Sequence, residues 1–413
     1  GWCIKMNLKR KLWWAQHKND VFKYGIILSL VLIVTISIIY FTYSKFSSTN
    51  EATAYETTVE PFIKNDDFIA SYIDGEWSNE IPGKDDGYVV DKIVCDNGAT
   101  GTWNNEEWGI NIRNATKKIK CSVFFVVKPL SAADKITTLA TTDTTNFATD
   151  DPDNNIRYIG ANPNNYVYFN CSDYNNQSDS TCEKWRIIGV FKNMTKEDGS
   201  KADLVKIIRD DSLGDIAWDS NDVSNWSKAS LQTTLNGEYY NGTYATGALK
   251  NDTTRNAIES VVWNLGEVAD DNSAIASHFY EYERGTTVHS GRPTTWTGKV
   301  GLMYPSDYGY ATSGGSTTDR STCLSKELYQ WASVNDCYNN DYLFNDSYYQ
   351  WTLTPLLSNI YYVLYVVTTG AVYRSSVDLD YNSVRPVAFL KSNILIKDGG
   401  SGTAESPYQL SLK

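Results

Sequence analysis

The sequence predicts an α+β fold with a single N-terminal transmembrane helix, a small β-sandwich and a larger C-terminal domain. Three observations carry this prediction. Residues 24–43 contain no charged side chain and are rich in Ile, Leu and Val, as a membrane span requires. Downstream, short apolar runs alternate with Gly, Pro, Asn and Asp turns, and aromatic residues make up 13% of the chain. The 413 residues suffice for two or three domains.

The N-terminal segments predict a membrane anchor. Lys and Arg crowd residues 1–23, so the positive-inside rule predicts a cytoplasmic stub there and an extracellular remainder. The apolar stretch 24–43 is longer than that of a cleaved signal peptide, which favours a retained signal anchor. Polar residues 44–60 then form a spacer. We therefore expect a single-pass plasma-membrane protein with an extracellular C-terminal domain.

Residues 61–130 predict the β-sandwich module. Apolar runs separated by turn residues predict its strands, at 68–73, 88–94, 108–112 and 121–127. Residues 131–155 form a connector in which only 131–140 favour a helix, because the rest is rich in Thr, Asp and Asn.

Residues 156–413 form the predicted C-terminal domain. Residues 185–191 and 204–208 read as a hairpin whose tip contains Asp198-Gly199. A helix is expected after Ser227, ending at Gly237, and a second helix at 256–265. Residues 279–288 look like a strand.

Cysteine usage indicates an oxidising exterior. Cys3 lies in the predicted cytoplasmic stub, and six cysteines remain outside. Six cysteines allow 15 connectivities. Proximity in the sequence suggests three disulfides, namely Cys95 with Cys121, Cys171 with Cys182, and Cys323 with Cys337. Unpaired buried thiols are the alternative.

Charge and motif content exclude several functions. A net charge of -12 and an isoelectric point near 4.8 make nucleic acid an unsuitable partner. We expect no cofactor and no catalytic residue, because no zinc-protease helix and no serine-hydrolase elbow occurs. Two Asp/Asn-rich stretches, 151–155 and 378–382, start like calcium loops but lack the later Gly and Glu, so no metal is predicted.

The stretch 352–390 contains no Lys, Glu, Gln, Met or Trp. One explanation is burial, since core strands exclude Lys, Glu and Gln. The other is diversification, because adenine-directed mutagenesis of Asn codons never yields these five residues. Both explanations stay open on composition alone.

Several short motifs resemble a family. They resemble uncharacterised surface ectodomains of Gram-positive bacteria that look related to the C-type-lectin-like fold of formylglycine-generating enzymes. The variable proteins of diversity-generating retroelements use the same fold. The resemblance covers about 156–413 and implies a C-type-lectin-like domain with variable binding residues at 358–383. The motifs begin at Trp185, Ile207, Asn225, Trp263, Gly301, Trp351 and Val384.

We therefore expect a surface receptor or adhesin, and not an enzyme, that binds a protein or carbohydrate through a tyrosine-rich face. Trp351 and Arg385 are assigned to the scaffold. The alternatives are an extracellular enzyme on a formylglycine-generating-like scaffold, favoured by a free thiol, and a structural cell-envelope protein, favoured by burial of residues 361–381. The predicted contact residues are Asn359, Tyr361, Tyr362, Tyr365, Tyr373, Arg374, Ser375, Asp378, Asp380 and Tyr381.

Overall fold

The computed structural model describes Asn19 and residues 68–115, 118–397 and 399–412. The chain divides into two compact units between Lys128 and Pro129. The predicted transmembrane helix at 24–43 and the spacer at 44–60 lie outside the described residues, as does the predicted stub except for Asn19.

The predicted fold class is wrong. Strand accounts for 33% and helix for 17%, so the protein is mostly β. Within the described ranges, no helix is both long and apolar enough to cross a membrane. The helix α2 (Ala132–Ala140), for example, has 9 residues, whereas a span needs about 20. The short apolar runs of this sequence form strands instead.

The first unit is a four-stranded sheet with the order β2-β1-β6-β3, and a hairpin of β4 and β5 packs on one of its faces. Strands β1 and β6 run parallel. The hairpin brings Trp103 edge-on against Phe125 of β6, with ring centroids 5.4 Å apart. The strands are β1 (Phe68–Ile73), β2 (Glu76–Ser78), β3 (Tyr88–Cys95), β4 (Thr100–Asn104), β5 (Gly109–Arg113) and β6 (Lys120–Val127).

The second unit is built on an eight-stranded sheet. Its central path is β12-β19-β11-β10-β8-β7, while β15 pairs with β19 and β9 with β10. Buried Trp185, Ile187 and Val190 of β10 place this sheet in the main core. The strands are β7 (Phe147–Ala148), β8 (Ile156–Tyr158), β9 (Tyr166–Phe169), β10 (Glu183–Thr195), β11 (Lys201–Arg209), β12 (Ile258–Glu259), β15 (Val300–Gly301) and β19 (Val387–Leu390).

Short helices and two-stranded ribbons surround this sheet. The ribbons are β13 (Val261–Asn264) with β14 (Thr295–Gly298), and β20 (Leu395–Ile396) with β21 (Leu410–Ser411). Besides α2, the helical segments are η1 (Trp226–Lys228), α3 (Ser230–Thr234), the π-helical turn η2 (Leu235–Tyr239), α4 (Asp252–Ala257), α5 (Ala276–Glu283), α6 (Pro305–Gly309), α7 (Arg320–Leu324), η3 (Leu328–Ser333) and α8 (Asn335–Tyr338).

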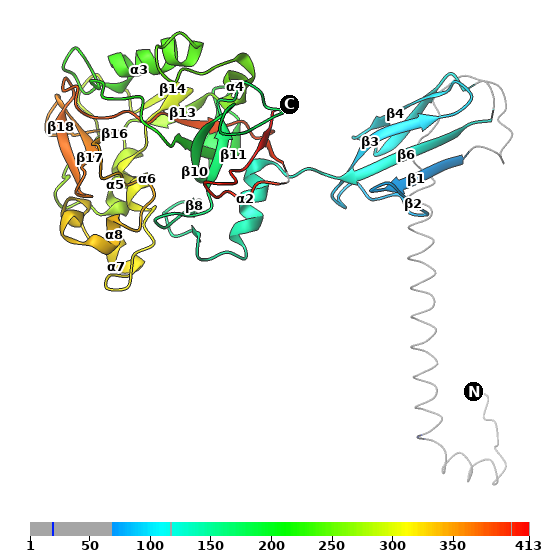
Figure 1. Ribbon diagram of the computed structural model, residues 1–413, viewed down its shortest axis with the longest axis horizontal. Helices are drawn as coiled ribbons and strands as arrows, with labels where there is room; N and C mark the ends of the chain where they lie inside the picture. The colour runs from blue at the N-terminus through cyan, green and yellow to red at the C-terminus, as the bar shows by residue number, and fades with distance from the viewer. Residues whose placement is uncertain (1–18, 20–67, 116–117, 398, 413) are drawn as a thin grey trace, which may run out of the picture. The chain divides into compact units, whose positions relative to one another are not determined.

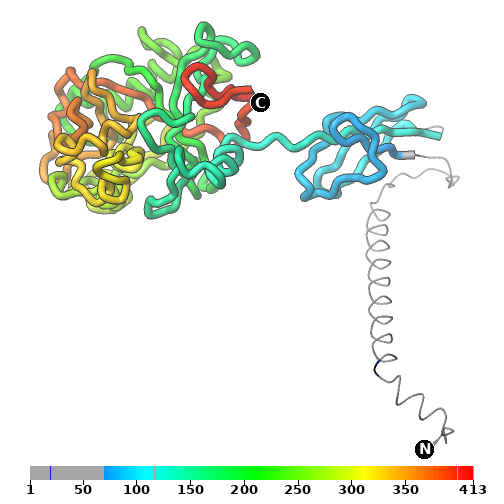
Figure 2. The backbone as a smooth tube through the Cα atoms, turned by 60° about the horizontal axis from the view of Figure 1, so that its bottom comes forward, coloured from blue at the N-terminus to red at the C-terminus, as the bar shows by residue number. Residues whose placement is uncertain are grey.

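A separate three-stranded antiparallel sheet carries five of the ten predicted contact residues. Its strands are β16 (Gln350–Pro355), β17 (Tyr362–Val366) and β18 (Val372–Ser376). In Figure 1, β17 and β18 lie at one end of the unit and the C-terminal segment at the other. Figure 2 shows the same separation from a view turned by 60°.

Several predicted elements are confirmed. The strands expected in the first unit appear as β1, β3, β5 and β6, and the expected hairpin of the second unit is β10 with β11. Helix α2 occupies the predicted helical part of the connector. Ser131 caps it by accepting a hydrogen bond from the Asp134 amide, and Ala132, Ala133 and Ile136 are buried in the core of the second unit.

Three predicted elements differ from the structure. The helix expected at 256–265 is instead the end of α4 followed by β12 and β13, because Val261 and Val262 pair with β14 in an antiparallel ribbon. The strand expected at 279–288 begins within helix α5, which buries Phe279, Tyr280 and Glu283 on one face. After Ser227, the expected single helix is split into η1, α3 and η2.

All three suggested disulfides are confirmed: Cys95–Cys121, Cys171–Cys182 and Cys323–Cys337. The first lies in the first unit, where it links the paired strands β3 and β6. The other two close short loops in the second unit. Three disulfides fit an extracellular or secreted protein.

A substitution of Gly189 in β10 tests how closely the strands of the central sheet pack. A Cβ at this position would collide with the carbonyl oxygen of Ile156 in β8. We predict that Gly189→Ala lowers the free energy of unfolding by about 1–3 kcal/mol, because the strands must separate. Chemical denaturation provides the measurement. Gly237→Ala is the control, since nothing lies within 4 Å of its added Cβ, and a loss of stability shared by both variants would contradict this account.

Candidate functional site

The sheet β16-β17-β18 and its flanking loops gather five tyrosines into one connected array. Ring centroids are 5.4 Å apart for Tyr329 and Tyr373, and 6.5 Å for Tyr373 and Tyr365. They are 5.6 Å apart for Tyr365 and Tyr349, and 6.2 Å for Tyr349 and Tyr381. We call these five residues the tyrosine face.

The tyrosine face is partly open to solvent. Tyr329, Tyr373 and Tyr381 are 40%, 36% and 47% exposed, and Tyr349 and Tyr365 are half-buried between them. Burial, followed by the proximity of Tyr381, Tyr349 and Tyr373, raises the pKa of Tyr365 to about 12. Tyr365 therefore keeps its proton at neutral pH and presents an uncharged hydroxyl group.

Local structure holds these rings in place. Tyr365 and Tyr373 are direct cross-strand neighbours on β17 and β18. Gly370 lies in the turn between the two strands with a positive φ of 88°, and an added Cβ there would collide with the ring of Tyr338. The Ser383 amide donates to the carbonyl of Tyr349 at 2.7 Å, which ties the loop after β18 to the start of β16.

The back of the sheet is anchored in the core. The Trp351 indole donates to the carbonyl of Ile216 at 2.8 Å, and the Trp218 indole to that of Thr352 at 3.1 Å. Buried Arg385 donates to the carbonyl of Arg209 at 2.9 Å. These contacts of Trp351 and Arg385 with the core are consistent with the scaffold role predicted for them.

The ten predicted contact residues fall into three environments. Tyr361, Tyr373, Asp378, Asp380 and Tyr381 are exposed, whereas Asn359, Tyr362, Tyr365 and Arg374 are half-buried and Ser375 is buried.

Two of the polar residues among the ten are already engaged. Arg374 forms an ion pair with buried Asp271 at 2.9 Å. Ser375 accepts a hydrogen bond from Asn382 at 3.3 Å. The charge of Arg374 is thus neutralised by Asp271, and Ser375 is buried.

Sequence reasoning missed two members of the tyrosine face. Tyr329 lies on η3 and Tyr349 just before β16, so both fall outside the stretch 352–390 with its unusual composition. Tyr349 belongs to the Tyr348-Tyr349 pair two residues before Trp351, which was the available signal. No local pattern connects Tyr329 with the sheet.

Burial explains part of the unusual composition. Val363, Leu364, Val366 and Val372 are fully buried, which accounts for the absence of long polar residues at these positions. It does not account for the exposed Tyr, Asp and Ser positions of 358–383. Diversification of those positions stays a prediction, because it depends on codons.

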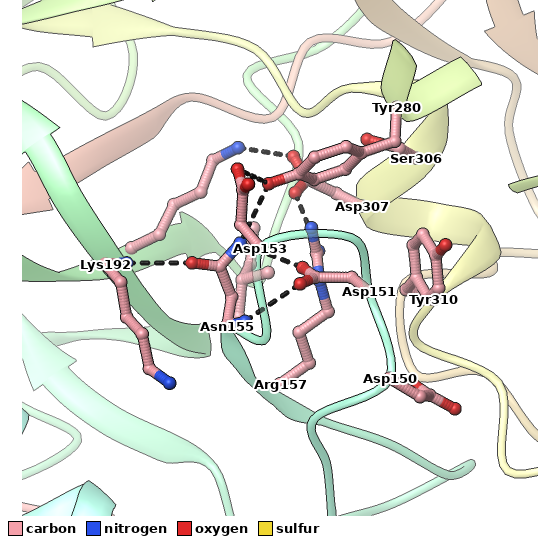
Figure 3. Close-up of polar contacts among 12 residues, drawn as sticks. Asp150, Asp151, Asp153, Asn155, Arg157, Lys192, Tyr280, Ser306, Asp307 and Tyr310 are labelled. Carbon is pink, nitrogen blue, oxygen red and sulfur yellow. Dashed lines mark hydrogen bonds and ion pairs between the residues drawn. The ribbon is translucent and has the colours of Figure 1, made fainter. Parts of the chain in front are cut away.

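A second candidate region is a buried ion network that joins distant elements (Figure 3). Asp307 on α6 accepts from Arg157 of β8 at 3.1 Å and pairs with Lys206 of β11. Arg157 also pairs with Asp151 at 2.6 Å. All four side chains are buried, so these charges must neutralise one another.

Aromatic rings enclose the ammonium group of Lys206. Its Nζ lies 4.6 Å from the ring centroid of Tyr304 and 5.0 Å from that of Phe191. Burial, only partly offset by Asp307, lowers the pKa of Lys206 to about 8. Lys206, Tyr280 and Arg284 are among the residues that line a cavity of about 270 Å³. Because Lys206 pairs with Asp307, we interpret this arrangement as one that stabilises the fold.

Residues close to Asp151 in the sequence supply the hydrogen bonds that its carboxylate accepts. Asp151 accepts from Asn155 at 2.9 Å and from Arg157 at 2.6 Å, so its carboxylate is already engaged by buried side chains. No cluster of three or more His, Cys, Asp or Glu side chains in the described ranges is arranged to hold a metal ion.

The six described cysteines and His289 have structural partners. Cys95, Cys121, Cys171, Cys182, Cys323 and Cys337 are all disulfide-bonded, so the free thiol on which the enzyme alternative depended is not found among the described cysteines. His289 contacts Glu267 at 2.6 Å, and Glu267 also accepts from Arg292 at 2.7 Å.

Comparison of the chain with known protein families, characterised proteins and solved structures finds no match. The resemblance to surface ectodomains with a C-type-lectin-like fold therefore remains a prediction.

The ion network predicts a cost for losing one charge. We expect Asp307→Asn to lower the free energy of unfolding by about 3–5 kcal/mol, because Arg157 and Lys206 would keep buried charges without a carboxylate. Denaturant titration measures the loss. Asp150→Asn is the control, since Asp150 pairs with Arg320 at 2.7 Å near the surface and should cost no more than about 1 kcal/mol. Equal costs would contradict the prediction.

Glu283 predicts a pH dependence of stability. It is fully buried and accepts from the Ser306 amide at 2.9 Å, and burial raises its pKa from 4.5 to about 7 despite the neighbouring Arg284. The folded state therefore retains a proton that the unfolded state loses. As the pH rises from about 4.5 to about 7, this group should lower the free energy of unfolding.

Glu283→Gln should remove this contribution, because glutamine does not titrate. Urea denaturation of both proteins at several pH values measures this contribution. The free energy of unfolding should decline less steeply with rising pH in the variant than in the unmodified chain. Identical pH profiles would contradict the assignment to Glu283.

Proposed function

We propose that the chain is an extracellular ligand-binding protein, a receptor or adhesin, whose tyrosine face contacts a protein ligand. The observation that carries the proposal is the connected and partly exposed array of Tyr329, Tyr349, Tyr365, Tyr373 and Tyr381. The three disulfides support the extracellular part.

Tyrosines suit this role for a physical reason. Each supplies a large amphipathic surface with few rotatable bonds, so ordering it on binding costs little entropy. Aromatic residues are correspondingly enriched in the cores of protein interfaces. Here the rings are already positioned by one another and by a sheet anchored through Trp351, which lowers the cost of binding further.

Charge at the edge of the face favours a partner with basic groups. Asp378 and Asp380 are exposed in the loop that leads to Tyr381. Arg374, the basic residue of the predicted contact set, is neutralised by Asp271. A ligand that places Lys or Arg at this edge gains electrostatic complementarity and a faster association rate.

Exposure argues against a purely structural role. A cell-envelope protein without a ligand was expected to bury residues 361–381, yet Tyr361, Tyr373 and Tyr381 each expose more than a third of their surface. If 358–383 is diversified, Tyr365, Tyr373 and Tyr381 vary while Tyr329 and Tyr349 stay fixed. The face would then combine constant and variable rings.

A triple variant tests the proposal. Tyr329→Ser, Tyr373→Ser and Tyr381→Ser together should weaken ligand binding at least about 100-fold, because central aromatic contacts each contribute about 2 kcal/mol or more. Surface plasmon resonance against immobilised panels of basic proteins and of oligosaccharides measures the effect. The melting temperature should change little, since these three side chains are exposed.

The control replaces three exposed apolar residues outside the face, Trp77, Val127 and Leu130, with Ser. It should bind as the unmodified chain does. Binding that survives the triple tyrosine change, or that both variants lose equally, would overturn the proposed face. Binding only to oligosaccharides would support the tyrosine face as the binding site but contradict the proposal that the ligand is a protein.

A further inference from the structure

A polar pocket of about 410 Å³ lies in the second unit, apart from both the tyrosine face and the ion network. Arg186 of β10, Arg385 and Asp341 line it, with Asp210, Asp346 and Ala161. The first three are buried, whereas Ala161 and Asp346 are exposed. None of these six residues belongs to a feature that the proposed function uses for contact with a ligand.

Arg186 is held firmly but is left with unused donors. Its guanidinium lies 3.7 Å from the ring centroid of Tyr166 and 5.0 Å from that of Tyr342. Its Nε donates to Asn165 at 2.5 Å. Its Nη1 lies 3.8 Å from Asp210, beyond hydrogen-bonding distance, and its buried Nη2 has no partner.

Arg385 repeats this arrangement. Its Nε and Nη1 donate to the Arg209 carbonyl at 2.9 Å and to Gln350 at 3.0 Å. Its Nη2 comes only within 3.9 Å of the same Asp210 oxygen. One half-exposed carboxylate thus faces two buried guanidinium groups without a direct hydrogen bond to either.

Asp341 adds an unused carboxyl oxygen. Asp341 is 3% exposed; its Oδ1 accepts from the Leu343 amide at 2.8 Å, and its Oδ2 has no partner. Burial raises the pKa of Asp341 well above its usual range. Buried polar atoms without partners cost roughly 1–3 kcal/mol each, so their presence around one pocket points to a ligand.

We propose that this pocket binds a small carboxylate that carries a hydrogen-bonding group on the adjacent carbon, as α-hydroxy and α-amino acids do. The carboxylate accepts from the unused nitrogens of Arg186 and Arg385, which present the planar donor geometry that carboxylates match. The adjacent hydroxyl or ammonium group interacts with Asp341 or Asp210.

Charge excludes other ligand classes. Two guanidinium groups disfavour a metal cation, and Asp210 with Asp346 disfavours a multiply charged phosphate. The two guanidinium groups and the carboxylates of Asp210 and Asp346 offset one another, so the pocket suits a small ligand of low net charge, a monoanion or a zwitterion. The volume lies within the range of about 300–1,000 Å³ that is usual for small-molecule sites.

Isothermal titration calorimetry with the full chain tests the proposal, using glycolate, glycine and acetate as probes. Glycolate or glycine should bind at least tenfold more tightly than acetate, which lacks the second group. Ala161→Phe should weaken that binding at least tenfold, because the ring would enter the pocket from an exposed position. Asn162→Phe is the matched control, since Asn162 is an exposed neighbour outside the pocket lining, and it should bind normally.

Arg186→Gln adds a direct test and should also weaken binding at least tenfold, while Ala161→Phe covers the case in which this buried change prevents folding. Absence of binding by both glycolate and glycine would overturn the proposal. So would acetate binding as tightly as they do, or equal binding by the Ala161 and Asn162 variants. Tighter binding of glycolate identifies the hydroxy acids as the ligand class, and tighter binding of glycine identifies the amino acids.

Discussion

The second unit depends on one buried carboxylate, that of Asp307. It joins Arg157 of β8 and Lys206 of β11 to the first turn of α6, and it also accepts from the Tyr304 amide at 2.9 Å, which caps the helix. The next residue, Tyr308, is buried and donates its hydroxyl hydrogen to the carbonyl of Gly370 at 2.8 Å. Because Gly370 forms the turn between β17 and β18, this short path connects the central sheet with the tyrosine face.

That connection explains how the tyrosine-rich segments form a defined surface. Helix α6 packs against β16 and β17, and the disulfide Cys323–Cys337 closes the loop that contains η3 and Tyr329. The rings are therefore held from two sides, by the core and by a covalent link. A pre-formed aromatic surface of this kind keeps more of its contact energy for the ligand. The polar pocket around Arg186 is a separate feature with different chemistry.

Local patterns in the sequence predicted several individual elements but not the fold class. The hairpin of β10 and β11 and the capped helix α2 follow from turn residues and periodicity, and the disulfides follow from proximity. The helix prediction for residues 256–265 was wrong because a short run with several apolar residues fits either a helix or a strand until its partner β14 is known. Helix α5 was missed because its Phe and Tyr residues are also common in strands. The ion network could not be predicted, since Arg157 and Asp307 meet only through the fold.

The candidate site was predicted in part. The unusual composition of 352–390 pointed to β17 and β18, while Tyr329 and Tyr349 joined the face only through tertiary structure. The most direct test of the central claim is hydrogen–deuterium exchange with the tightest-binding protein of the panel. The account predicts slower exchange in 329–333, 349–351 and 362–381 when that ligand is bound. Slower exchange confined to other parts of the chain would contradict it.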